Sequence, residues 1–61
     1  MKIQFDPQFA QAYGNRGIVY NQIGNKQKAI ENFQQAVQMF QAQNNTNGYE
    51  QAIKLLKQLQ R

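Results

Sequence analysis

The chain of 61 residues lacks cysteine, histidine, serine and tryptophan, and it has only one threonine, one proline and three acidic residues. Without cysteine no disulfide can stabilise so short a chain, and without cysteine or histidine the common zinc sites cannot form. Nucleophilic and general acid–base catalysis mostly rely on serine, cysteine, histidine or paired carboxylates. We therefore expect a protein that is not an enzyme, with no catalytic residues, no metal site and no cofactor.

The three acidic residues are explained by local helix chemistry. Asp6 precedes Pro7, as expected for a residue that caps the first turn of a helix. Glu50 stands four residues before Lys54, which is the favourable order for an ion pair on a helix surface. Glu31 follows two nearby lysines. Because each carboxylate has such a local role, general acid–base catalysis is not indicated.

Long apolar runs are also missing. The sequence has no stretch of about twenty apolar residues, which a transmembrane helix requires. It also lacks the charged and then apolar leader of a signal peptide. We expect one small cytoplasmic domain that is only marginally stable alone, since 61 residues bury a small core.

Small and aromatic residues recur at regular intervals in the first two thirds of the chain. The steps are 4, 3, 4, 5, 4 and 3 residues, and they connect Tyr13, Gly17, Tyr20, Gly24, Ala29, Phe33 and Ala36. Steps of three and four keep one face of a helix, whereas the step of five crosses Gly24 and Asn25. The spacing predicts two helices that pack face to face and are joined at this turn.

Start and stop signals give the bounds of these two helices. The first helix is predicted over about residues 7–22, and Gly24 supplies the left-handed residue that ends a helix. Asn25 can cap the next helix, which is predicted over about residues 26–43.

The remainder of the chain predicts a loop and a third helix. Asparagine and glycine dominate residues 44–48, and Asn47 followed by Glu50 three residues later resembles a capping box. The apolar residues of segment 49–61 fall on one side of a helix. We therefore expect a loop over 44–48 and a helix over 49–61.

The stretch Ala10–Gln43 resembles one complete tetratricopeptide repeat, a helix–turn–helix unit of 34 residues. The signature residues of the family are matched by Tyr13, Gly17, Tyr20, Ala29, Phe33 and Ala36, with Gly24 in the usual turn. The resemblance implies an all-α fold of the α–α superhelix type. Residues 1–7 would be the tail of a preceding repeat or a lead-in, 8–43 one helix pair, 44–48 a loop, and 49–61 a C-terminal capping helix.

Three features depart from the family pattern. Arg16 stands where the repeat usually has leucine, so we expect its stem to lie along apolar surface and its guanidinium to reach solvent or a carbonyl. Gln41 replaces the usual proline, which predicts a second helix about one turn longer than in most members. The third helix lacks the glycine and second tyrosine of a repeat, and this indicates a terminal cap.

The resemblance implies a non-enzymatic interaction or scaffolding module that binds a peptide or partner protein. Residues two positions away from the packing face turn to the other side of the first helix, which forms the concave groove in this family. The predicted contact residues are Gln11, Gly14, Asn15, Ile18, Asn21 and Gln22. Gly14 and Ile18 stand where carboxylate-binding members have lysine and asparagine, so we do not expect recognition of a C-terminal carboxylate.

Two alternatives concern the packing of the module itself. A single repeat leaves an apolar side uncovered, and Phe5, Phe9 and Ala10 are predicted to lie there. The chain could therefore be a purely structural end-cap of a longer solenoid, or it could form a homo-oligomer through this side.

The net charge of +4 suggests two further partners. A basic amphipathic third helix could lie on an anionic membrane, and basic residues with aromatic rings could bind single-stranded nucleic acid. Both are less favoured, because the cations are spread along the chain and the aromatic residues are needed for packing. We expect no small-molecule substrate.

Overall fold

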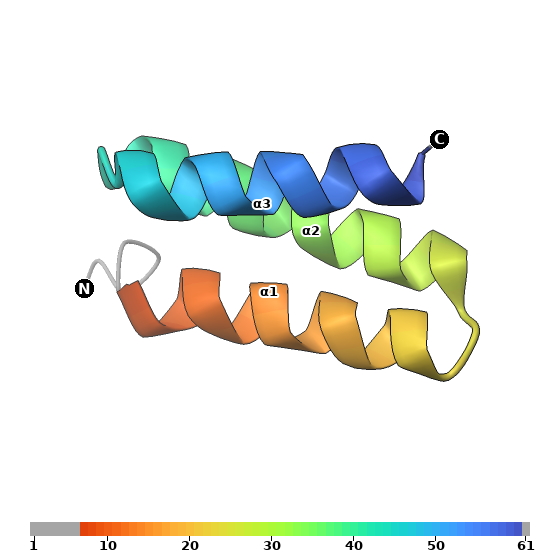
Figure 1. The fold of residues 1–61 in the computed structure, drawn as a ribbon. Helices are drawn as coiled ribbons and strands as arrows, with labels where there is room; N and C mark the ends of the chain where they lie inside the picture. Colours follow the sequence, from red (N-terminus) through yellow and green to blue (C-terminus); the bar gives the residue numbers. More distant parts are fainter. Residues whose placement is uncertain (1–6, 61) are drawn as a thin grey trace.

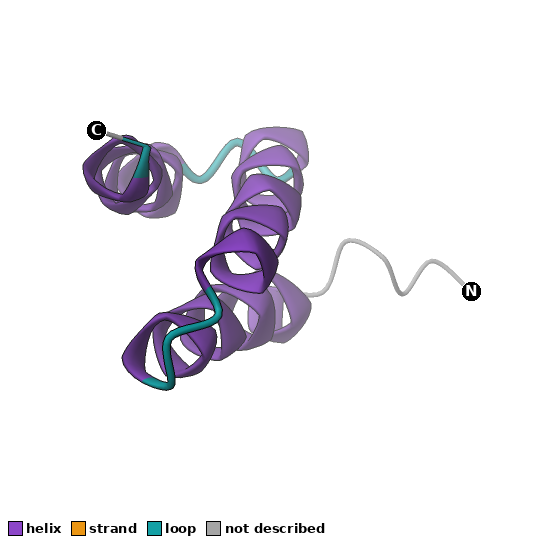
Figure 2. Cartoon of the chain, turned by 90° about the vertical axis from the view of Figure 1, so that its right-hand side faces the viewer, coloured by secondary structure: helices purple, strands orange, loops and turns teal. Residues whose placement is uncertain are grey.

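The computed structural model describes residues 7–60, which form three α-helices (Figure 1). They are α1 (Pro7–Gln22), α2 (Lys26–Ala42) and α3 (Thr46–Leu59). The middle helix packs against both of the others. Viewed along the helix axes, the three helices form a bent row with α2 in the middle (Figure 2). The predicted all-α class and the predicted helical hairpin are confirmed. The predicted cap Asp6 lies outside the described residues.

Small residues bring α1 and α2 close together. Gly17 of α1 is buried, and a β-carbon at this position would lie 3.1 Å from three ring atoms of Phe33 in α2. Ala10, Ala29 and Ala36 are completely buried around this contact. Glycine at position 17 therefore allows the Phe33 ring to fill the space between the two backbones, as the sequence spacing predicts.

The linker between α1 and α2 closes both helix ends with hydrogen bonds. The Gly24 and Asn25 amides donate to the carbonyls of Asn21 (3.2 Å) and Tyr20 (2.8 Å), which satisfies the last turn of α1. Gly24 has a φ of 89°, a conformation that glycine adopts without strain. The Asn25 side chain then accepts from the Lys28 amide at 3.2 Å and caps α2. The predicted roles of Gly24 and Asn25 are confirmed.

The linker between α2 and α3 repeats this arrangement. The Asn44 and Asn45 amides donate to the carbonyls of Gln41 (3.1 Å) and Phe40 (2.9 Å), and Asn44 takes the left-handed conformation with a φ of 59°. The Asn45 side chain accepts from the Gly48 amide at 3.0 Å. One short pattern, a left-handed residue followed by a capping asparagine, thus forms both linkers between the three described helices.

The start of the third helix corrects the sequence prediction. α3 begins at Thr46, inside the segment 44–48 that was expected to be a loop, and its cap is Asn45 rather than Asn47. Asn45 has non-helical dihedral angles (φ −93°, ψ 88°), as a capping residue requires, whereas Asn47 already belongs to the first turn. The capping-box interpretation of Asn47 and Glu50 is therefore wrong. The second helix ends at Ala42, one residue before the predicted bound.

Candidate functional site

A shallow groove runs between α1 and α3, with α2 as its floor. Its volume is about 80 Å³. Residues of all three helices line it: Gln11, Gly14, Asn15, Ile18, Phe33, Phe40, Gly48, Gln51, Ala52 and Leu55.

Four of the six predicted contact residues line this groove. They are Gln11, Gly14, Asn15 and Ile18, which fall on one side of the first three turns of α1. The other two, Asn21 and Gln22, lie in the last turn of α1, where they are exposed and outside the groove. A role of any of the six in partner binding stays a prediction.

The contribution of α3 to the groove was missed by sequence analysis. Gly48, Gln51, Ala52 and Leu55 form the wall opposite α1. Their spacing of three, one and three residues keeps them on one side of a helix, so the signal was present in the sequence. It was overlooked because the contact residues were sought on the first helix alone.

Gly14 differs from the other three glycines of the chain. Gly17 and Gly48 leave room for phenylalanine rings, and Gly24 has a positive φ. At Gly14, by contrast, a β-carbon would meet no atom of the described residues within 4 Å, and the backbone is helical. Neither packing nor backbone conformation therefore requires a glycine at position 14, which opens onto the groove.

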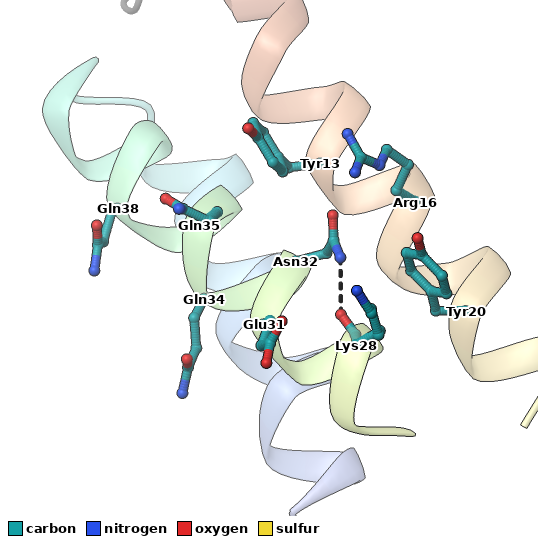
Figure 3. Close-up of a pocket in the computed structure, with 9 residues that line it drawn as sticks. All are labelled: Tyr13, Arg16, Tyr20, Lys28, Glu31, Asn32, Gln34, Gln35 and Gln38. Atoms are coloured by element: carbon teal, nitrogen blue, oxygen red, sulfur yellow. Dashed lines mark hydrogen bonds between the residues drawn. The ribbon is translucent and has the colours of Figure 1, made fainter. Parts of the chain in front are cut away.

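A second, larger hollow of about 450 Å³ lies between α1 and α2, and Figure 3 shows the residues around it. Its lining is mostly polar and consists of Tyr13, Arg16, Tyr20, Lys28, Glu31, Asn32, Gln34, Gln35 and Gln38. The Arg16 guanidinium carbon lies 5.4 Å from the centre of the Tyr13 ring, within the range of a cation–π contact. Arg16 is exposed, so its charged group reaches solvent as predicted.

Asn32 is a buried polar residue that sequence analysis missed. Its side chain is 7% exposed, and Nδ2 donates to the Lys28 carbonyl at 2.8 Å (Figure 3). Its Oδ1 is buried and has no hydrogen-bond partner among the described residues. The position could have been recognised, because Asn32 lies three residues after Ala29 and four before Ala36 on the packing face of α2.

We identify the smaller groove as the candidate binding site. Phe33 on its floor and Ala52 in its α3 wall are buried apolar residues, and the exposed amides of Gln11, Asn15 and Gln51 stand at its sides. An apolar core with a polar rim is typical of protein interfaces. The larger hollow is a less suitable binding site. The rings of Tyr13 and Tyr20 are half-buried packing residues, and the Asn32 Oδ1 atom is covered by protein atoms.

The outer side of α1 carries exposed apolar residues. Phe9 is 41% exposed, Val19 53% and Ile23 69%. Of the three residues predicted for an uncovered apolar side, Phe9 is exposed, Phe5 lies outside the described residues, and Ala10 is completely buried. The prediction for Ala10 is wrong because this residue precedes the buried Gly17 by seven positions, which places it on the same face of α1, toward α2.

Metal and membrane sites can be examined over residues 7–60. In this part of the chain no three histidine, cysteine or acidic residues come together as metal ligands. None of the three described helices is long and apolar enough to cross a membrane. A cytoplasmic location stays a prediction.

Comparison with known proteins identifies the repeat. The sequence model of the tetratricopeptide repeat matches residues 10–42, more than half of the chain. This range contains α2 and all but the first turn of α1. Searches of curated proteins and of solved structures give no significant match. The chain belongs to the tetratricopeptide repeat family, whose repeats generally serve as protein-interaction modules and are typically not catalytic.

Proposed function

We propose that this protein binds a peptide or a segment of a partner protein in the groove between α1 and α3. The observation that carries the proposal is Gly14. A glycine within a helix costs about 0.5–1 kcal/mol of stability relative to alanine, because glycine has more freedom to lose on folding. Gly14 lies in the middle of α1, and a methyl group there would meet no atom of the described residues within 4 Å.

A partner gives a physical reason for this glycine. Removing the side chain at position 14 exposes the backbone of α1 to the groove, so that another polypeptide can approach it closely. Gly17 and Gly48 have a comparable reason within the chain itself, because a phenylalanine ring lies against each of them. At Gly14 the space is open.

The amides around the groove suit a polypeptide ligand. Gln11 and Asn15 are exposed on the α1 side, and Gln51 is exposed on the α3 side. Each carboxamide has two N–H donors and one oxygen acceptor, so it can pair with both the N–H and the C=O groups of a peptide backbone. The apolar floor would then receive a side chain of the ligand.

A matched pair of variants tests the proposal. Asn15 and Asn21 are both exposed on α1, but only Asn15 lines the groove. Peptides are selected from a displayed random library on the wild-type protein, and their affinities are measured by fluorescence polarisation with Asn15→Lys and Asn21→Lys. We expect a loss of about tenfold, or 1.4 kcal/mol, with Asn15→Lys alone. Equal affinities for the two variants, with unchanged circular dichroism spectra, would contradict the proposal.

A second function is favoured by the exposed apolar residues of α1. Phe9, Val19 and Ile23 leave apolar surface on the outer side of the hairpin, and stacked repeats bury such surface against one another. The module would then be the end unit of a longer solenoid, or it would associate with a second copy. This function does not compete for the groove, because none of the three residues lines it.

A further inference from the structure

We infer that the groove selects a ligand segment without charged residues and accepts one apolar side chain of that segment. The inference rests on the proposed function, because it specifies the partner of the same groove. It begins from the distribution of charge. Among the described residues that line the groove, none is charged, although the chain has a net charge of +4.

The charged side chains are directed to other surfaces. Arg16, Lys28 and Glu31 surround the polar hollow between α1 and α2 (Figure 3). Glu50 and Lys54 line a neighbouring depression on α3, which shares only Gln51 with the groove. Net charge alone would predict an acidic partner, but none of the lysines and arginines within residues 9–60 lines the groove.

A charged ligand residue would be poorly accommodated in the groove. The exposed lining groups are amides, which can replace some hydrogen bonds to water but cannot neutralise a charge. A charge that loses its water and gains no counter-ion is strongly disfavoured. A neutral segment has no such penalty, because its backbone N–H and C=O groups can pair with Gln11, Asn15 and Gln51.

The size and the floor of the groove define the inserted group. A volume of about 80 Å³ is far below the roughly 300–1,000 Å³ of sites for drug-sized ligands, so the groove has room for about one side chain. Ile18 and Leu55 stand on its two sides, and Phe33 and Phe40 lie beneath. A leucine, isoleucine or methionine side chain fits this apolar environment.

The residue composition of selected peptides tests the inference. A displayed library of random 12-residue peptides is selected on the wild-type protein and on Gly14→Leu, which places a bulky side chain in the groove. We expect peptides that only the wild type retains to contain an apolar residue and to be depleted in charged residues about tenfold relative to the library.

A second pair of variants reverses the expected selectivity. Gln51 and Gln58 are both exposed on α3, and only Gln51 lines the groove. Gln51→Lys should enrich aspartate and glutamate in the selected peptides about tenfold, whereas Gln58→Lys should leave the selected composition unchanged. The two variants have the same net charge, so the comparison isolates the charge in the groove from the charge of the protein.

The outcomes separate the inference from the proposed function. Suppose that the peptides retained by the wild type but not by Gly14→Leu are rich in acidic residues. This result would overturn the inference and leave the proposed function standing. Identical pools on the wild type and on Gly14→Leu would overturn both. As a control, the circular dichroism spectrum of every variant shows whether it is folded, so that loss of peptide binding is not caused by unfolding.

Discussion

The ring of Phe40 in α2 lies so close to Gly48 in α3 that a β-carbon at position 48 would come within 2.5 Å of two ring atoms. This contact joins the third helix to the hairpin at its N-terminal end. Gly48 lies in the first turn of α3, so this turn packs against α2. Both residues also line the candidate groove.

Gly48→Ala should therefore destabilise the protein. The added methyl group would push the Phe40 ring or the first turn of α3 away, and overpacking of this kind costs about 1–3 kcal/mol. Urea denaturation followed by circular dichroism measures the change in the free energy of unfolding. An unchanged or increased stability would show that α3 does not pack on Phe40 in this way.

Gly14→Ala should have the opposite effect on stability. With open space around position 14, alanine should raise the free energy of unfolding by about 0.5–1 kcal/mol through its better helix propensity. The same urea titration serves as the measurement, with Gly17→Ala as a control that should destabilise because of Phe33. If Gly14→Ala also lowers stability, the glycine has a structural role and does not indicate a binding groove.

Asn45→Ala and Asn47→Ala distinguish the two candidate caps of α3. Loss of the Asn45 side chain removes the acceptor of the Gly48 amide, and such a loss costs about 1 kcal/mol. Asn47 lies in the first turn of the helix and is exposed, so its replacement should change stability by less than about 0.5 kcal/mol. Thermal unfolding of both variants gives the comparison. A larger effect of Asn47→Ala would restore the capping box that the sequence suggested.

Phe9→Asp tests whether the outer side of α1 mediates association. Phe9 is the third residue of α1, where an acidic side chain is favourable to the helix, so the variant should remain folded. If the wild type forms dimers or larger species in sedimentation velocity, Phe9→Asp should shift it toward monomer, whereas Gln22→Asp should not. A wild type that stays monomeric at high concentration would exclude self-association through this side.

The hairpin was predictable because its signals are local. Gly24 and Asn25 specify the turn by backbone conformation and capping, and the spacing from Gly17 to Phe33 specifies the packed faces. Each of these signals acts within a few residues or across one turn. The α1 side of the groove was predictable for the same reason. Once the packing face of α1 is known, helical periodicity gives the side on which Asn15 and Ile18 lie.

The start of α3 and the second wall of the groove were not predictable in this way. Asn44, Asn45 and Asn47 all have side chains that can cap a helix, so local chemistry does not choose among them. The burial of Asn32 was not predicted either, because its polar side chain by itself indicates an exposed position on α2.

The sequence by itself determined the helical hairpin, its turn and the side of α1 that faces the groove, because these depend on helical periodicity and on glycine and asparagine at the turn. Tertiary structure decided where α3 begins, since the Phe40 ring packs against a helical Gly48 and selects Asn45 as the cap. It also decided that Gln51 and Leu55 complete the groove and that the charged residues of the described helices lie elsewhere. Those features depend on how three helices pack together, which no single segment specifies.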